Sequence, residues 1–233
     1  MDYADAHLHS KGMVYLGSDS AMLMSVCSAE FGDWDIVDKI DDPRVIRSYG
    51  VHPWYSESWE DGSVDKLREM LQNDPDAQVG EIGLDEVKGP SMIVQSRCFE
   101  EQFELAAEMG RIVSIHSVRT ENYVLAAVKR NRKGCKAVIL HSFSGPMNYV
   151  QSFAKLDCYF SVSPRLLSKQ EPFVKALLEA IPRDRLLIET DSPDSGQNFT
   201  SAEEFIGRLA DIIGMDPEEL AGVTLENAER VFR

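Results

Sequence analysis

With 233 residues, the chain is long enough to bury one large hydrophobic core. Its apolar fraction of 43% and charged fraction of 27% are those of an ordinary globular protein and exclude an extensively disordered chain. Its formal net charge of −15 repels polyanions at long range, which argues against a protein that holds duplex DNA along its surface, although metal ions can supply positive charge locally.

Short apolar runs alternate with longer amphipathic stretches along the chain, and this alternation predicts strands separated by helices. The predicted strands are, in chain order, Tyr3–Leu8, Ala21–Cys27, Val45–Val51, Gln78–Ile82, Ile112–His116, Ala137–His141, Cys158–Val162 and Leu186–Thr190. The predicted helices are Trp34–Ile40, Val64–Gln72, Ser96–Met109, Asn122–Arg130, Met147–Lys155, Pro172–Ala180, Ser201–Ile213, Asp216–Ala221 and Leu225–Phe232. We expect one domain spanning residues 1–233.

Eight strands alternating with helices fit either a closed (β/α)8 barrel or an open, doubly wound sheet. The histidines favour the barrel, because all five fall at the C-terminal ends of predicted strands: His7, His9, His52, His116 and His141. Active sites of (β/α)8 barrels are assembled at the C-terminal ends of the strands, and imidazole is the commonest metal ligand among side chains. We therefore predict an α/β fold, a (β/α)8 TIM barrel with a metal centre.

Two carboxylates occupy similar positions. Glu81 follows Gly80 in the fourth strand, where ligands can approach closely and a carboxylate can bridge two cations. Asp191 follows the eighth strand, where a buried carboxylate needs a cation or hydrogen-bond donors. Glu189 lies two residues earlier on the same face, and we interpret it as a structural acid beneath the site.

Taken singly, each of these residues also fits a structural role, as a hydrogen-bonded core histidine or as an acid that caps a helix. Taken together, four histidines and two carboxylates from five strand ends suit one or two divalent ions, with positions left open for water and substrate.

Five segments carry a resemblance to a known family. They are Asp5-x-His7-x-His9, Gly50-Val51-His52-Pro53, Gly80-Glu81-Ile82-Gly83-Leu84-Asp85, His141-Ser142-Phe143-Ser144-Gly145 and Glu189-Thr190-Asp191-Ser192-Pro193. In this order they resemble the signature motifs of the TatD family, and the resemblance covers nearly the whole chain. It implies a distorted barrel of the amidohydrolase-like, metallo-dependent hydrolase type. It also implies a metal-dependent deoxyribonuclease that cleaves phosphodiester bonds from the 3′ end of DNA.

The resemblance further implies two divalent metal ions, which we expect to be Mg²⁺, Mn²⁺ or Zn²⁺. The implied ligands are His7, His9 and Asp191 for one ion, and His116 and His141 for the other, with Glu81 bridging. The expected catalytic residues are Asp191, Glu81 and His52. Asp191 would accept a proton from the attacking water, and His52 would contact the substrate phosphate.

Further substrate contacts are expected from the same rim. Arg119 and Arg165 follow the fifth and seventh strands and can reach a nucleic-acid backbone, although each also fits a solvated loop charge. Trp54, Tyr55 and Trp59 follow His52, and they either stack on bases or cover the rim.

The chain departs from the family pattern at Ser10 and Lys11, at Glu86, directly after His116 and over residues 194–199. These positions leave the implied metal ligands intact, and they lie in loops that would select the substrate. Two alternatives therefore stay open: a metallohydrolase of a small ester, lactone or amide, and a non-catalytic metal- or partner-binding protein.

A basic run, Lys129–Lys136, lies between a predicted helix and the sixth strand, at the end of the barrel opposite to the predicted site. Cations at the C-terminus of a helix interact favourably with its dipole, and we prefer this explanation to a nucleic-acid site.

The remaining features concern location and partners. The four cysteines include no Cys-x-x-Cys pair, the first ten residues are too polar for a signal peptide, and no apolar run reaches the roughly 18 residues that span a bilayer. We expect a monomeric, cytoplasmic protein without membrane contact, which acts on DNA or on another phosphodiester or small-molecule substrate.

Overall fold

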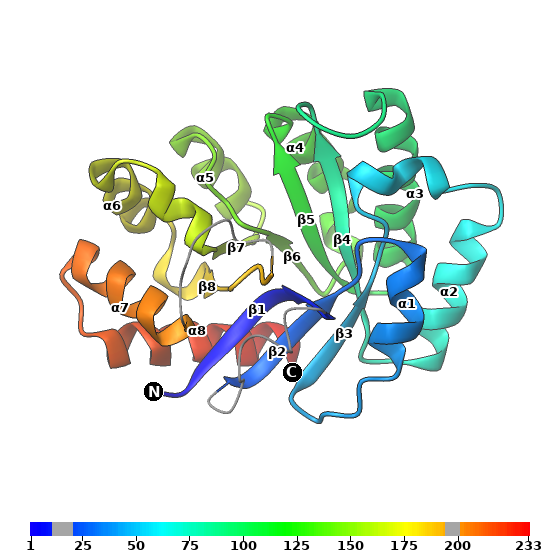
Figure 1. Ribbon diagram of the computed structural model, residues 1–233. Helices are drawn as coiled ribbons and strands as arrows, with labels where there is room; N and C mark the ends of the chain where they lie inside the picture. The colour runs from blue at the N-terminus through cyan, green and yellow to red at the C-terminus, as the bar shows by residue number, and fades with distance from the viewer. Residues whose placement is uncertain (11–20, 194–200) are drawn as a thin grey trace.

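A sheet of eight parallel strands lies at the centre of the molecule (Figure 1). In this computed structural model, which describes residues 1–10, 21–193 and 201–233, the strands pair in chain order. Their bounds are β1 Tyr3–His9, β2 Ala21–Cys27, β3 Val45–Tyr49, β4 Gln78–Asp85, β5 Ile112–Val118, β6 Ala137–Leu140, β7 Tyr159–Val162 and β8 Leu186–Ile188. All eight predicted strands are present, and β4 and β5 continue beyond their predicted ends, to Asp85 and Val118.

Helices connect the strands and surround the sheet on its outer side (Figure 1). The α-helices of the described residues are α1 Phe31–Asp38, α2 Ser63–Asn73, α3 Met92–Glu108, α4 Glu121–Asn131, α5 Met147–Ala154, α6 Glu171–Ala180, α7 Ala202–Ile213 and α8 Pro217–Phe232. Short 3-10 helices are η2 Pro53–Ser58, η3 Arg132–Gly134, η4 Pro164–Ser168 and η5 Arg183–Arg185.

The prediction of two separate C-terminal helices, Asp216–Ala221 and Leu225–Phe232, is wrong, because α8 is continuous from Pro217 to Phe232. Its interior Gly222 costs about 1 kcal/mol relative to alanine. Packing of α8 against β1, β2 and β8 offsets this cost. Asn227 adds two hydrogen bonds of 2.8 Å from its Nδ2 to the carbonyl oxygens of Arg183 and of Leu186, the first residue of β8. Tertiary contacts thus override the local helix-breaking tendency.

Backbone hydrogen bonds join β1 to the segment that follows β8 and bring the two edges of the sheet together. The amide of Asp191 donates to the carbonyl oxygen of His7 at 3.0 Å, and the amide of His9 donates to that of Ser192 at 2.9 Å. The predicted (β/α)8 barrel is confirmed, and its seam lies beside the residues predicted to bind metal.

A buried carboxylate strengthens the same seam. Asp5 on β1 accepts hydrogen bonds from the backbone amide of Thr190 at 2.9 Å and from its hydroxyl at 2.6 Å. Burial raises the pKa of Asp5 to about 7, although both hydrogen bonds from Thr190 oppose that change. The first and last strands are therefore held together by side chain as well as backbone.

The apolar core has two parts. One lies between the strands and the surrounding helices and contains most of the large buried side chains. The other fills the barrel interior and is closed by the end of α8, with Ala4, Leu23, Ile139, Leu187, Val231 and Phe232 among its members. The polar cluster described below therefore lies above a filled interior, as in other (β/α)8 barrels.

Two features of the structure bear on membrane insertion and on disulfide bonds. No helix within the described ranges is long and apolar enough to cross a bilayer. The four cysteines are buried and unpaired.

Gly83 on β4 offers a test of this packing. Its φ is +150°, and a Cβ added there would overlap the backbone of His116 on the neighbouring strand. We predict that Gly83→Ala destabilises the fold by on the order of 3 kcal/mol, measured by urea unfolding. Gly32→Ala on α1 is the matched control, because its Cβ meets no atom within 4 Å and alanine favours a helix. Equal stability of the two variants would contradict the close approach of β4 and β5.

Candidate metal centre and active site

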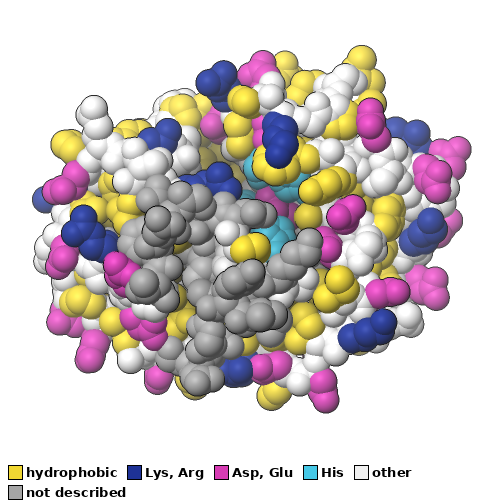
Figure 2. Space-filling view, in the orientation of Figure 1, with side chains coloured by type: hydrophobic (Ala, Val, Ile, Leu, Met, Phe, Trp, Pro, Cys, Tyr) yellow, Lys and Arg dark blue, Asp and Glu magenta, His cyan; other side chains and the backbone are white. Residues whose placement is uncertain are grey.

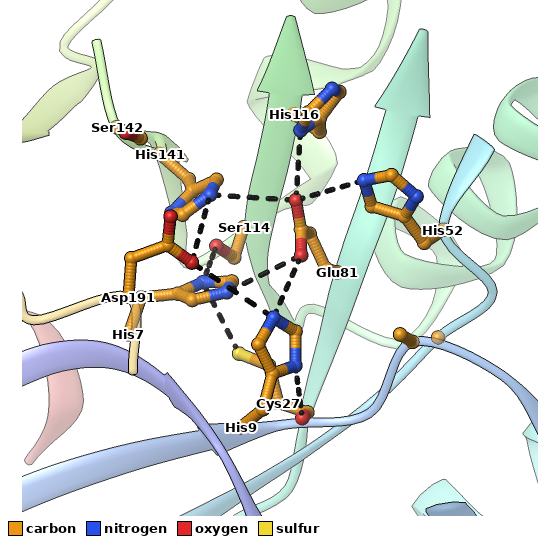
Figure 3. Close-up of polar contacts among 12 residues, drawn as sticks. His7, His9, Cys27, His52, Glu81, Ser114, His116, His141, Ser142 and Asp191 are labelled. Carbon is orange, nitrogen blue, oxygen red and sulfur yellow. Dashed lines mark hydrogen bonds and ion pairs between the residues drawn. The ribbon is translucent and has the colours of Figure 1, made fainter. Parts of the chain in front are cut away.

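The carboxylate of Glu81 lies at the centre of the site, and every histidine of the chain contacts it (Figure 3). Its Oε2 faces β1, at 3.4 Å from Nε2 of His7 and 3.5 Å from Nε2 of His9. Its Oε1 faces the other side, at 2.9 Å from Nδ1 of His116, 3.3 Å from Nε2 of His52 and 3.4 Å from Nε2 of His141. The two oxygens of one carboxylate thus divide the histidines into two groups.

Glu81 reaches this position because β4 runs unusually close to its neighbours. A Cβ at Gly80 would lie 2.8 Å from the Cβ of Ser114 on β5, so only glycine permits the approach. The amide of Glu81 is held by the carbonyl oxygen of Ser28 at 3.0 Å. The Glu81 side chain is almost fully buried, and a charged group in that setting needs cationic partners.

Each of four histidines uses its outer ring nitrogen to contact a neighbouring group. Hydrogen bonds join His9 to the Cys27 carbonyl oxygen at 3.1 Å, His116 to Asp85 Oδ2 at 3.2 Å and His7 to Ser114 Oγ at 3.1 Å. Nδ1 of His141 lies 2.9 Å from Glu189 Oε1 as an ion-pair contact without a hydrogen bond. The Cys27 carbonyl and the Asp85 carboxylate only accept, so the outer nitrogens of His9 and His116 carry protons. The inner nitrogen of neutral His9 then presents a lone pair toward Glu81, as in metal-binding histidines, whereas Nδ1 of His116 donates a hydrogen bond of 2.9 Å to Glu81 Oε1.

In His52 the outer ring nitrogen accepts a hydrogen bond, in contrast to the outer nitrogens of His9 and His116, which donate. It precedes η2, and its Nδ1 accepts a hydrogen bond of 3.1 Å from the backbone amide of Trp54. In the neutral imidazole the proton is therefore on Nε2, which points toward Glu81 Oε1. His52 is thus a hydrogen-bond donor at the centre, whereas neutral His9 presents a lone pair there.

Charges in the cluster oppose the effect of burial. Burial by itself raises the pKa of Glu81, but the imidazoles around it, His52 and His141 foremost, hold that pKa well below its ordinary value. Burial likewise acts to raise the pKa of Asp85, and hydrogen bonds from His116 and Trp54 lower it further than burial raises it. Both carboxylates therefore remain ionised and attract protons or a cation.

The imidazoles respond in different ways. Burial lowers the pKa of His52, and the nearby carboxylate only partly offsets this. Burial also opposes protonation of His116, but the two flanking carboxylates raise its pKa to about 9. For His7, burial is outweighed by Cys27 and Glu81, which hold the pKa well above its ordinary value. A divalent ion has to compete with protons for these nitrogens.

Two observations indicate that the residues around Glu81 can hold a divalent cation. Tetrahedral Zn²⁺ with bonds of about 2.0–2.1 Å places its ligand atoms about 3.3–3.4 Å apart. Nε2 of His7, His9 and His141 lies 3.4–3.5 Å from a Glu81 oxygen, which is close to that spacing. In addition, Nε2 of His7 is fully buried and makes no hydrogen bond, as expected for a lone pair aimed at an ion.

Asp191 lies at the edge of this cluster, directly after β8. Its Oδ1 is 4.0 Å from Nε2 of His9 and 3.9 Å from Nε2 of His141, and its Oδ2 is 3.4 Å from Nε of Arg165. His7, His9 and Asp191 form one group of potential ligand atoms within 4.8 Å of one another, and His52, Glu81 and His116 form another. The sequence-based grouping had placed His141, in place of His52, with Glu81 and His116.

A cavity of about 350 Å³ opens above the cluster, and in the space-filling view histidine and acidic side chains are visible at its floor (Figure 2). Of the predicted substrate contacts, His52, Trp54 and Arg165 line it. Arg119 is exposed and is not among the lining residues. Lys11 and the altered segment 194–199 lie outside the described residues.

The aromatic residues after His52 have different positions. Trp54 and Tyr55 line the cavity, and Trp54 donates a hydrogen bond of 2.7 Å to Asp85. Trp59 is buried in the core, where its indole donates to Glu101 at 2.8 Å. Only the first two are placed to meet a substrate.

Sequence reasoning gave no role to two residues of the site. Asp85 binds both His116 and Trp54, and its alternation with Glu81 along one face of β4 was a usable signal. Lys88 lines the cavity with its ammonium 3.3 Å above the Trp54 ring. No pattern in the sequence distinguishes this lysine from other loop lysines.

The Asp85–His116 contact can be tested in metal-free protein. We predict that Asp85→Asn lowers the pKa of His116 from about 9, measured by NMR titration, because a negative partner is lost. A raised histidine pKa stabilises the fold fully below about pH 6.5, and this contribution disappears as the pH rises through the folded-state pKa. The stability lost in Asp85→Asn should therefore shrink above about pH 9. An unchanged His116 titration would contradict the contact, and Asp211→Asn on the exposed face of α7 is the control.

Comparison with known proteins agrees with this geometry. The family model for TatD-related DNases matches residues 18–233. The uncharacterized metal-dependent hydrolase YabD of Bacillus subtilis is 28% identical, and the match covers 98% of both chains. The 3′-5′ ssDNA/RNA exonuclease TatD of Salmonella typhimurium is 28% identical over 82% of this chain and 78% of its own.

Solved structures share the fold. A TatD homologue from Escherichia coli K12 superposes with a TM-score of 0.82 at 22% identity, over 99% of this chain and 97% of that one. An amidohydrolase from Saccharomyces cerevisiae has a TM-score of 0.74 at 15% identity and covers 99% of both chains. The resemblance drawn from the five sequence motifs is confirmed, and the chain belongs to the TatD-related DNase family of hydrolytic enzymes.

Proposed function

We propose that this protein is a metal-dependent phosphodiesterase that removes nucleotides from the 3′ end of single-stranded DNA. The observation that carries the proposal is the convergence of every histidine of the chain on one buried carboxylate, beneath an open cavity. The relative from Salmonella typhimurium is named a 3′-5′ ssDNA/RNA exonuclease, which supports the choice of substrate class.

The chain would hold two divalent ions through side chains whose inner atoms face the centre. His7, His9 and Asp191 would bind one ion, His116 and His141 the other, and Glu81 both. The proton positions on two histidines support this division, because His52 presents an N–H to the centre and neutral His9 presents a lone pair. Bound there, divalent ions would lower the pKa of water and balance negative charge on phosphoryl oxygens.

Asp191 is the group best placed to accept a proton. Its Oδ1 faces the histidines and its Oδ2 faces Arg165 at the cavity wall, so it spans the cluster and the solvent. We assign it the role of general base, which orients the attacking water and takes its proton. Arg165 lies on the same wall and can hold a phosphate oxygen beside that carboxylate.

His52 and Lys88 would act on the opposite side. The N–H at Nε2 of His52 can donate to a phosphate oxygen or to the leaving oxygen, since its Nδ1 is fixed by the Trp54 amide. The ammonium of Lys88 and the rings of Trp54 and Tyr55 offer a cation and stacking surfaces for one strand end. These local cations oppose the repulsion expected from the overall charge of −15.

The activity is tested with a single-stranded oligonucleotide labelled at its 5′ end. We expect stepwise shortening in Mn²⁺ or Mg²⁺, none in EDTA, and a loss of at least 100-fold in Asp191→Asn, because removal of a general base typically costs 10²–10⁴ in rate. Asp211→Asn on the exposed face of α7 should retain full activity.

Absence of cleavage by metal-loaded, folded protein would contradict the nuclease proposal. Turnover of a small ester, lactone or amide under the same conditions would then identify the alternative hydrolase. Binding of metal without turnover of any of these substrates would point to a non-catalytic protein.

The division between ligands and donor is tested by a pair of variants. We predict that His141→Ala weakens Mn²⁺ binding by at least 100-fold, because loss of even a supporting group costs 10–100-fold, whereas His52→Ala leaves the affinity nearly unchanged and lowers kcat. Isothermal titration calorimetry and the oligonucleotide assay measure the two effects. Equal losses of affinity in both variants would make His52 a ligand and overturn the assignment.

The monomeric state and the cytoplasmic location inferred from the sequence stay predictions. Gel filtration with light scattering would measure the first.

A further inference from the structure

A second hollow lies at the opposite end of the barrel from Glu81. It has a volume of about 260 Å³ and is located where β6, β7 and β8 begin, beside the last turn of α8. Four cationic residues line it, together with one acid and one aromatic ring: Arg132, Lys136, Arg185, Arg230, Asp157 and Tyr159. A concentration of positive charge is unexpected in a chain with a net charge of −15.

The cations come from three separate parts of the sequence. Arg132 and Lys136 belong to the basic run that the helix dipole explains, whereas Arg185 precedes β8 in η5 and Arg230 lies on α8. The dipole of α4 does not explain why Arg185 and Arg230 also face this hollow. Folding brings residues from positions almost 100 apart onto one surface, so the helix-dipole interpretation of the basic run is incomplete.

Backbone carbonyls hold the guanidinium of Arg132 without neutralising it. Its nitrogens donate to the carbonyl oxygens of Leu156 at 2.9 Å, Cys135 at 3.0 Å and Asp157 at 3.2 Å. A carbonyl carries no net charge, so the guanidinium is fixed in place and keeps its full positive charge. Two of its five N–H donors also remain for another acceptor.

The other cations are only weakly compensated. Arg185 lies 2.9 Å from the carboxylate of Asp184 and 3.4 Å from that of Asp157, but these side chains are 62% and 73% exposed, and exposed pairs contribute little. Arg230 is held by neutral acceptors, the Asp184 carbonyl at 3.4 Å and the Asn227 amide oxygen at 3.2 Å. The ammonium of Lys136 makes no hydrogen bond or ion pair with any described residue.

We propose that this hollow binds a small phosphate-bearing anion of at least two charges, such as inorganic pyrophosphate or the phosphate of a nucleotide. The remaining N–H donors of three guanidinium groups can meet the oxygens of a phosphate group, and the nearby ammonium adds a point charge. The guanidinium of Arg185 packs on the Tyr159 ring at 4.9 Å, which further limits its motion. The volume suits one or two phosphate groups and is too small for a strand of nucleic acid. The site is independent of the activity proposed above.

The proposal is tested by NMR titration of the full, metal-free chain with inorganic pyrophosphate. We expect saturable shifts of the amides of Lys136, Asp157 and Arg185, whether or not the upper cavity also responds. Lys136→Ala should weaken the affinity about tenfold, which is the usual worth of one charged hydrogen bond. Lys136 is exposed, so this variant should fold normally, and Arg230→Ala should have a similar effect.

Lys133→Ala is the matched control, because Lys133 is an exposed lysine of the same turn that does not line the hollow. Equal weakening by Lys133→Ala and Lys136→Ala, or shifts confined to the upper cavity, would overturn the proposal, as would no saturable binding at millimolar pyrophosphate. Citrate at the same concentration tests the chemical class, since equally tight binding of this carboxylate would exclude phosphate recognition. Tighter binding of a nucleoside monophosphate than of pyrophosphate would identify a nucleotide as the source of the phosphate.

Discussion

The closure of the barrel between β1 and the end of β8 is the constraint on which the site depends. Two backbone hydrogen bonds place Asp191 beside His7 and His9, and without them the first and last strands of the sheet would lie on opposite edges. The Asp5 carboxylate adds two short hydrogen bonds to Thr190 at the same place. The residues that maintain the fold and those of the candidate metal centre therefore alternate along the same two segments.

A second constraint is the direction of each hydrogen bond around Glu81. Acceptors behind His9 and His116 fix protons on the outer nitrogens, while the Trp54 amide behind His52 leaves the proton on the inner nitrogen. One buried carboxylate is thus surrounded by imidazoles that look alike in the sequence and differ in chemical character. This difference separates groups suited to hold an ion from a group suited to donate a proton or a hydrogen bond.

Much of the fold and of the site follows from the sequence, for identifiable reasons. Apolar runs that end in histidine or acid mark the C-terminal ends of strands, and this pattern located His116, His141 and Asp191 correctly at the rim. The proton position on His52 did not follow, because it depends on a backbone amide oriented by the turn at Pro53.

Features that depend on long-range packing were also beyond sequence reasoning. The continuity of α8 through Gly222 results from its contacts with the barrel, which no local pattern encodes. Arg185 and Arg230 carry no motif, and only the folded chain brings them to the basic run before β6. Arg119 directly follows β5, yet it is not among the residues that line the cavity.

The most direct test of the central claim is anomalous diffraction from crystals grown with Mn²⁺ or Zn²⁺, recorded at the absorption edge of the metal. The account predicts anomalous peaks on both sides of the Glu81 carboxylate, about 2.0–2.2 Å from its oxygens and from the inner nitrogens of His7, His9, His116 and His141, with His52 outside bonding distance. No peak beside Glu81, or a metal bound through Nε2 of His52, would contradict it.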